Sequence, residues 1–130
     1  MPLQNLNHLL VLARDLDATR DFYVEVLGLT VGPRPPFRIP GYWLYLGDRA
    51  VVHLAGTGSG PETLDTGPID HIAFEATGLE DMVARLEDLA IPVRHRKVPD
   101  LGLHQIFIHD PNGVKIELNY PAAEGAAFDL

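Results

Sequence analysis

Two segments of the chain repeat apolar residues at the spacing of an α-helix. The first, residues 15–27, places Phe22 and Val26 on one face, and an aspartate at its start is a favourable N-cap. The second, residues 79–90, has a longer apolar stripe, and Pro92 prevents its continuation. The sequence therefore predicts one helix in each half of the chain.

Short runs typical of β-strands follow each predicted helix. The clearest pair flanks Asp110-Pro111-Asn112-Gly113, because a proline followed by Asn-Gly favours a tight hairpin turn. A second hairpin is expected around Gly47-Asp48-Arg49. The predicted strands are Leu29–Val31, Trp43–Leu46 and Ala50–Ala55 in the first half, and Val93–Lys97, Gln105–Ile108 and Val114–Asn119 in the second.

The two halves of the chain repeat this order of elements. Asn7-His8-Leu9-Leu10 resembles Asp70-His71-Ile72-Ala73 at an offset of 63 residues (71 minus 8). Each copy runs from this short apolar segment into a helix and then into strands, which predicts an α+β fold of two βαβββ modules. We expect one domain over residues 1–130: modules at about 5–55 and 69–120, a flexible linker at about 56–68, and a peripheral tail at 121–130.

Composition and charge narrow the classes of protein that agree with this pattern. The chain has 130 residues, 46% hydrophobic and 22% charged, which is ordinary for a globular domain. A formal net charge of -8 opposes contact with a phosphate backbone, so no nucleic-acid partner is expected. The absence of cysteine excludes disulfides and thiolate ligands. No apolar run reaches membrane-spanning length and no signal peptide is evident, so we expect a cytoplasmic protein without a membrane partner.

Four polar residues occupy matching places in the two modules. His8 and His71 stand in the segments that open each module, and His53 and Glu117 stand in the last strand of each, 64 residues apart (117 minus 53). Alternation along the last strand puts its Val, Ile and Leu residues on one face and Glu117 on the other. An internally symmetric fold would bring the four residues toward one axis.

Three imidazoles and one carboxylate are a suitable ligand set for one divalent metal ion, such as Zn, Ni, Co, Mn or Fe. Taken singly, a strand histidine is more often a hydrogen-bonded structural residue, and a strand glutamate is more often exposed. The matched placement in two copies is what favours a metal site. Without His53, the remaining residues would form a set of two histidines and one carboxylate with open positions.

The candidates for contact with a substrate are Trp43, Tyr45, His104, Gln105 and Lys115. The two aromatic residues either line a cavity or belong to the core. Strand parity leaves the direction of His104 and Gln105 open, whereas Lys115 shares the strand face of Glu117. The basic segment 94–97, which includes His95, is typical of a solvated strand face.

Taken together, the motifs resemble those of the vicinal oxygen chelate superfamily, which includes glyoxalase I, bleomycin-resistance proteins, fosfomycin-resistance enzymes, methylmalonyl-CoA epimerase and extradiol dioxygenases. The resemblance covers about residues 5–120. It rests on His8 with Thr19, Phe22-Tyr23 and Leu27-Gly28-Leu29, on Asp70-His71-Ile72-Ala73-Phe74, and on Asp110-Pro111-Asn112-Gly113 with Ile116-Glu117-Leu118. The first of these motifs is similar to the amino-terminal signature of glyoxalase I.

The resemblance implies that the two modules form a cupped, partly closed mixed sheet around a metal. His8, His71 and Glu117 hold the positions shared by most metal-using members, and His53 stands where glyoxalase I carries a fourth ligand, usually Glu. The resemblance also implies a homodimer and a small-molecule substrate that chelates the metal through vicinal oxygens. By analogy with glyoxalase I, Glu117 is the candidate catalytic base of a lyase or isomerase.

Other activities remain open at this stage. An Fe(II) extradiol-type ring-cleaving dioxygenase would use the same ligands, but His104 lies closer to Asp110 than its signature has it, and Phe107 replaces its tyrosine. A thiol transferase of the fosfomycin-resistance kind ranks third, because the chain has no match to its potassium loop. In a different class, a metal-free binding or resistance protein would sequester a small hydrophobic or aromatic compound.

Overall fold

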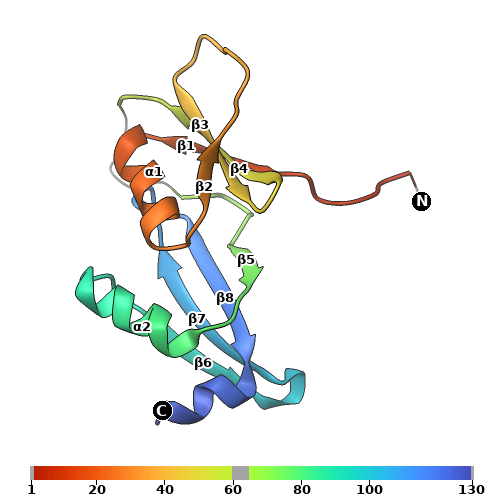
Figure 1. Ribbon diagram of the computed structural model, residues 1–130, viewed down its shortest axis with the longest axis vertical. Helices are drawn as coiled ribbons and strands as arrows, with labels where there is room; N and C mark the ends of the chain where they lie inside the picture. The colour runs from red at the N-terminus through yellow and green to blue at the C-terminus, as the bar shows by residue number, and fades with distance from the viewer. Residues whose placement is uncertain (1, 60–64, 130) are drawn as a thin grey trace. The chain divides into compact units, whose positions relative to one another are not determined.

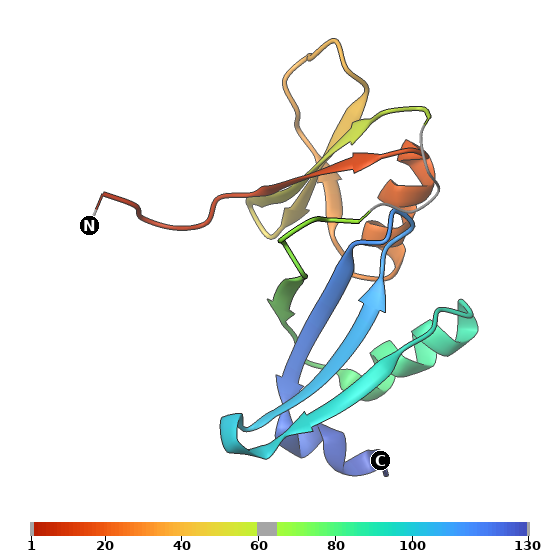
Figure 2. The same ribbon diagram turned by 180° about the vertical axis from the view of Figure 1, so that it is seen from behind.

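The computed structural model describes residues 2–59 and 65–129. It consists of two compact units, Met1–Thr63 (unit 1) and Leu64–Leu130 (unit 2), and each is described by itself. Within its described residues, each unit carries one α-helix and one four-stranded sheet (Figures 1 and 2). The central part of the predicted linker, residues 60–64, lies outside the described residues.

Unit 1 follows the predicted βαβββ order. Its elements are β1 (Leu9–Ala13), α1 (Leu16–Glu25), β2 (Thr30–Gly32), β3 (Gly41–Leu46) and β4 (Arg49–Gly56). The sheet order is β1-β4-β3-β2, in which β1 runs parallel to β4 and the other pairs are antiparallel. The core lies between the sheet and α1, where Val52 and Leu54 of β4 are buried with Phe22 and Tyr23 of the helix.

Unit 2 repeats the same order. Its elements are β5 (Ile72–Glu75), α2 (Leu79–Asp88), β6 (Arg94–Val98), the 3-10 turn η1 (Pro99–Leu101), β7 (Leu103–His109), β8 (Lys115–Pro121) and the 3-10 helix η2 (Ala122–Ala127). The sheet order is β5-β8-β7-β6, again with one parallel pair, β5 with β8. The predicted α+β class and βαβββ order are confirmed. Within each unit the described sheet is open, so partial closure is not a property of either unit by itself.

The two helices are capped in different ways. Asp15 caps α1, because its Oδ1 accepts a hydrogen bond from the backbone N–H of Ala18 at 3.0 Å. Gly78 precedes α2 and has no side chain to cap it. Instead, Oε1 of Glu124 in η2 accepts from the N–H groups of both Gly78 and Leu79 at 2.9 Å. The start of α2 therefore depends on a residue from the C-terminal tail.

The last hairpin is built by the Asp-Pro-Asn-Gly turn. Oδ1 of Asp110 accepts from the N–H groups of Asn112 at 2.8 Å and Val114 at 2.9 Å, and Gly113 has a φ of 92°. Buried and half-buried residues then alternate along β8, with Ile116 and Leu118 in the core. Glu117 consequently lies on the open face of the sheet, as its strand parity predicted.

The C-terminal tail is not peripheral, which corrects the expectation from its sequence. His104 is 1% exposed under η2, and a Cβ at Gly125 would lie 2.7 Å from its Cγ. Nδ1 of His95 and Nε2 of His104 are 2.8 Å apart, and the ring of Phe128 lies against both imidazoles. His95 is therefore half-buried in a histidine pair and does not belong to a solvated face. A short Ala- and Gly-rich tail gives no periodic signal, so its packing could not be seen in the sequence.

No helix in the described part of the chain is long and apolar enough to cross a membrane. The two α-helices have ten residues each, about half the length that a membrane-spanning helix needs.

Candidate metal centre

The two units place their predicted ligands at equivalent positions of equivalent sheets. In unit 1, Leu10 of β1 is paired with His53 of β4, and His8 stands two residues before Leu10. In unit 2, Ala73 of β5 is paired with Glu117 of β8, and His71 stands two residues before Ala73. Because side chains alternate along a strand, each pair lies on the open face of its own sheet. The repeat seen in the sequence is thus reproduced in strand register.

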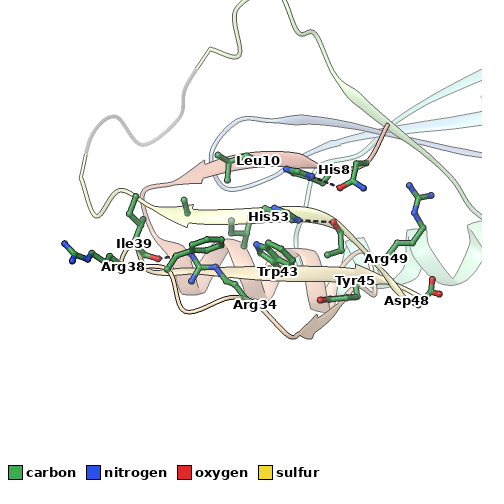
Figure 3. A pocket seen from close by; sticks show the side chains of 15 residues that line it. His8, Leu10, Arg34, Arg38, Ile39, Trp43, Tyr45, Asp48, Arg49 and His53 are labelled. Atoms are coloured by element: carbon green, nitrogen blue, oxygen red, sulfur yellow. Dashed lines mark hydrogen bonds between the residues drawn. The ribbon is translucent and has the colours of Figure 1, made fainter. Parts of the chain in front are cut away.

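The pair in unit 1 is a stack of aromatic rings. The imidazoles of His8 and His53 lie 3.8 Å apart, centroid to centroid, with 10° between their planes. The indole of Trp43, opposite His53 across the β3–β4 pair, stacks on the other side of that ring at 4.1 Å. Figure 3 shows the two histidines and Trp43 in succession across neighbouring strands. His53 is therefore held between two rings, which fixes the plane of its imidazole.

The pair in unit 2 joins an imidazole to a carboxylate. Nε2 of His71 lies 3.4 Å from Oε1 of Glu117. The other carboxylate oxygen, Oε2, accepts a hydrogen bond from Nδ2 of Asn119 at 2.9 Å, and Asn119 in turn accepts from Nε2 of Gln105 at 2.9 Å. Glu117 is largely buried, at 14% side-chain exposure, so these contacts fix which oxygen faces His71.

In both opening histidines, Nδ1 faces a side-chain oxygen of the preceding residue. Nδ1 of His8 is 2.8 Å from Oδ1 of Asn7, and Nδ1 of His71 is 2.8 Å from Oδ2 of Asp70. Each oxygen can only accept, so in the neutral ring Nδ1 carries the proton and Nε2 keeps its lone pair. For His53 the roles are reversed, because its Nε2 lies 3.1 Å from the carbonyl oxygen of Ala50. All three imidazoles are therefore prepared to offer one nitrogen as a ligand.

Electrostatics support this protonation pattern. Burial lowers the pKa of His53, and the neighbouring His8 ring and the charge of Arg34 lower it further, which favours the neutral, ligating form. Hydrogen bonds from His71 and then Lys115 lower the pKa of Asp70, so its carboxylate stays ionised. Nζ of Lys115 is 3.0 Å from Oδ2 of Asp70. Lys115 therefore acts on the partner of His71 and lies on the open face of unit 2.

Each unit thus carries two side chains of the types that bind divalent metals. Imidazole nitrogen and carboxylate oxygen suit Zn, Ni, Co, Mn and Fe, and an acceptor behind a ligating imidazole is the usual arrangement around protein-bound metals. Among the described residues, no group of three or more His, Asp or Glu side chains is arranged to hold a metal ion.

The candidates for substrate contact divide between the two sheets. Trp43 and Tyr45 line a pocket of about 1080 Å³ in unit 1, together with His8 and His53 (Figure 3). Other residues of this pocket come from β1, β4 and the loop 33–40. The aromatic residues are half-buried, so they belong to a cavity wall and not to the core.

Strand register shows to which face of the sheet Gln105 and His104 point. Gln105 pairs with Asn119, on the face of Glu117, whereas His104 pairs with the buried Tyr120 on the opposite face. The structure therefore brings Gln105 into the hydrogen-bond network of Glu117 and does not bring His104 to that face. The sequence left this point open because the register of β7 depends on its pairing with β6 and β8.

Sequence reasoning missed the residues that orient the ligands. In the sequence, Asn7 and Asp70 stand out only as part of the repeated segment, and Asn119 only as the last residue of a predicted strand. A polar side chain directly before each opening histidine was the signal that could have identified the first two.

Comparison with known proteins agrees with this architecture. Residues 5–118 match the family model described as the Glyoxalase/Bleomycin resistance protein/Dioxygenase superfamily. The chain belongs to this superfamily. It is also 34% identical over 124 residues to "Glyoxylase I 4" of Arabidopsis thaliana, an alignment that covers 89% of this chain and 70% of that relative.

Solved structures of superfamily proteins share the fold. A lactoylglutathione lyase from Agrobacterium tumefaciens superposes with a TM-score of 0.65 at 23% identity, covering 96% of this chain and 99% of that one. The fosfomycin resistance protein FosX from Listeria monocytogenes superposes with a TM-score of 0.72 at 16% identity, covering 94% and 97%. At these identities the likeness concerns the fold alone. Since one of these proteins is named as a lyase and the other as a resistance protein, the fold does not specify the function.

Proposed function

We propose that this superfamily member is a metal-dependent enzyme, a glyoxalase-I-like lyase or isomerase acting on a small substrate with vicinal oxygens. His8, His53, His71 and Glu117 are the proposed ligands of one divalent ion. The observation that carries the proposal is the matched pair of prepared imidazoles, His8 behind Asn7 and His71 behind Asp70. The family relative named as a glyoxylase I supports the reaction class.

Glu117 is the proposed catalytic base. When bound, the metal would act as a Lewis acid on the oxygens of the substrate. Oε1 of Glu117 faces His71, whereas Oε2 is occupied by the N–H of Asn119, so Oε1 is the oxygen that serves as ligand or takes up a proton. Gln105 holds the carbonyl oxygen of the Asn119 amide and thereby keeps its Nδ2 directed at Glu117.

Unit 1 supplies the proposed binding pocket. Trp43 and Tyr45 give an aromatic wall beside His53, and such apolar walls with few polar groups are typical of small-molecule sites. Asp70, the hydrogen-bond partner of His71, stays ionised because His71 and then Lys115 donate hydrogen bonds to it and lower its pKa. His104 has no part in the proposal, because it lies on the other face of its sheet.

We also propose that the protein is a homodimer and that it is cytoplasmic. Both proposals are supported by family membership alone.

The structure offers little to the extradiol dioxygenase alternative. A dioxygenase of this kind would use His104 as an acid-base residue and would need a tyrosine at the position of Phe107. His104 is covered by η2, and Phe107, which pairs with Glu117 on the open face, has no hydroxyl group. Neither residue can therefore serve the ring-cleavage chemistry beside Glu117.

The test is elemental analysis of protein purified without added metal or chelator. We expect about one divalent ion per chain, because neutral imidazole and carboxylate donors bind such ions at neutral pH. A His8→Ala, Glu117→Ala double variant should lose the ion. A His109→Ala, Glu80→Ala variant, which removes the same residue types at exposed positions, should keep it.

The loaded protein is then given hemithioacetals of 2-oxoaldehydes, whose isomerisation moves a proton between adjacent carbons. Turnover that depends on both the metal and Glu117 supports a lyase or isomerase. Failure to bind any of the candidate ions, even after reconstitution, contradicts the proposal and leaves a metal-free binding protein.

A further inference from the structure

The pocket in unit 1 has a composition that selects among substrates. It is formed entirely by residues of unit 1 and has a volume of about 1080 Å³, enough for an organic molecule of moderate size. Its lining is mostly apolar, and it opens on the sheet face that carries His8 and His53. Figure 3 shows the loop 33–40 at one side of this face, beside the stacked rings.

The apolar side of the pocket includes two large side chains that are more than half exposed. Phe37 is 55% exposed and Ile39 is 59% exposed, although both line the pocket beside Trp43. The ring of Phe37 lies 6.4 Å from that of Trp43 at 47°, which leaves two aromatic surfaces converging on the same space. Large apolar side chains gathered at a concave site usually mark a binding surface.

The loop that carries these residues is restricted before any ligand arrives. Prolines occupy four of its eight positions, and each fixes one backbone dihedral angle. Oη of Tyr45 donates a hydrogen bond to the carbonyl oxygen of Pro33 at 2.6 Å, which ties the loop to β3. A loop restricted in this way loses little conformational entropy when a ligand binds.

The pocket has more positive than negative side chains, whereas the chain as a whole is acidic. Three arginines line it against one aspartate, in a chain with a formal net charge of -8. Arg49 is engaged with the carbonyl oxygen of Leu6 at 3.2 Å, and Figure 3 shows Arg38 extended away from Trp43. Arg34 remains at the aromatic wall, and its guanidinium carbon lies 5.0 Å from the centroid of Phe37.

Arg34 is also held in place. Its Nη2 donates a hydrogen bond to the carbonyl oxygen of Ile39 at 2.8 Å, and the guanidinium lies close against Gly41, where a Cβ would contact Nη2 at 2.8 Å. A guanidinium has five N–H donors in a planar fork, so one hydrogen bond to the loop leaves others for a carboxylate. The positive charge thus stands at the edge of an aromatic slot.

We propose that this pocket binds a small organic anion with a flat apolar body, whose ring lies along Phe37 and Trp43 and whose carboxylate pairs with Arg34. The inference names the substrate class of the proposed enzyme, and it rests on the proposed function only in taking this pocket as the substrate pocket. Charge complementarity favours an anion over a neutral ring compound. The size and apolar lining favour a ring-bearing acid over a small polar acid.

The test compares 3-phenylpropionate with its neutral amide, 3-phenylpropionamide, on chelator-treated protein. The chain has one tryptophan, Trp43, so its fluorescence reports on this pocket alone. We expect the acid to bind about tenfold more tightly than the amide, the ratio that one charge-assisted hydrogen bond supplies. Arg34→Gln should abolish this preference, whereas Arg85→Gln, an equal change of charge on α2, should leave it intact.

A second variant separates the two parts of the slot. Phe37→Ala should weaken the acid and the amide by the same factor, because it removes apolar contact and no charge. Equal affinity for the acid and the amide, or a preference that survives Arg34→Gln, would overturn the inference. Because the protein is metal-free in this experiment, metal binding without acid preference rejects this inference alone. Acid preference without metal binding rejects the proposed function alone.

Discussion

The two units have the same backbone plan and different chemistry at the equivalent place. In unit 1, His8 and His53 are imidazoles in a stack that ends on Trp43. In unit 2, His71 faces the carboxylate of Glu117, which is held by a network of polar side chains. The register of the parallel strand pair is equivalent in both units, so the difference at the donor positions arises from the side chains.

This contrast suggests a division of roles between the repeats. Unit 1 surrounds its donors with rings and with a mostly apolar pocket, which suits recognition of a substrate. Unit 2 surrounds its donors with Asn119, Gln105, Asp70 and Lys115, which suits control of charge and of protons. A duplicated module can thus keep the position of its ligands while each copy acquires a different surrounding.

Glu117→Gln should have the largest effect on metal affinity. It removes the one anionic donor of the proposed set, so we expect the affinity for Ni²⁺ to fall by at least about 100-fold. His53→Gln keeps a neutral donor in unit 1 and should cost about tenfold or less. Isothermal titration calorimetry measures both, with Glu80→Gln on the exposed side of α2 as the charge-matched control. Equal losses for the two variants would show that the units do not differ in this way.

Gly125→Ala should affect only unit 2, because only that unit is covered by a C-terminal segment. The added methyl group would meet the buried ring of His104, and such overpacking costs about 1–3 kcal/mol of unfolding free energy. Urea denaturation measures the loss, and Ala123→Ser at an exposed position of η2 is the control. Unchanged stability would mean that η2 does not pack closely on β7 in solution.

Exchanging Asn7 and Asp70, the hydrogen-bond partners of the two opening histidines, should show how each partner affects metal affinity. Asp70→Asn gives unit 2 the partner found in unit 1 and should weaken metal binding by about tenfold, because a charged acceptor makes its imidazole a stronger ligand. Asn7→Asp should strengthen binding by a smaller factor. Calorimetric titration of both single variants and of the exchange variant measures these effects. A gain in affinity for Asp70→Asn would contradict the role given to this carboxylate.

Acidification should weaken unit 2 through its histidine pair, which has no counterpart in unit 1. Burial lowers the pKa of both His95 and His104 below the value of about 6.5 for an exposed histidine. The unfolded chain therefore binds more protons, so stability is present above about pH 6.5 and declines as the pH falls below it. Urea midpoints at pH 7.5 and 5 should differ less in His95→Gln than in the wild type. His109→Gln, at the exposed end of β7, the strand of His104, should retain the full difference.

Much of the fold and the ligand positions could be predicted because they depend on local patterns. The aspartate at the start of α1, the Asp-Pro-Asn-Gly turn and the alternation along β8 each act within a few residues, and together they place Glu117 on the open face. The repeat then related His53 to Glu117, and the strand register agrees with that relation.

What the sequence did not predict depends on contacts between distant segments. The direction of His104 is set by the register of three strands, and its cover is a tail whose small residues carry no periodic signal. Glu124 caps a helix that begins 45 residues earlier in the chain, at Leu79. Such contacts are decided by tertiary packing, which a single sequence does not encode in its local pattern.

Quenching of Trp43 by Co²⁺ tests most directly whether the four proposed ligands bind one ion. Trp43 stacks on His53, so a paramagnetic ion bound by His53 quenches its fluorescence, and Glu117→Gln weakens this quenching only if Glu117 is a ligand of the same ion. We predict saturating quenching at about one Co²⁺ per chain, and a concentration for half-quenching that rises at least about 100-fold in Glu117→Gln. Quenching that is unchanged in Glu117→Gln, or absent from the wild type, would contradict the proposed ligand set.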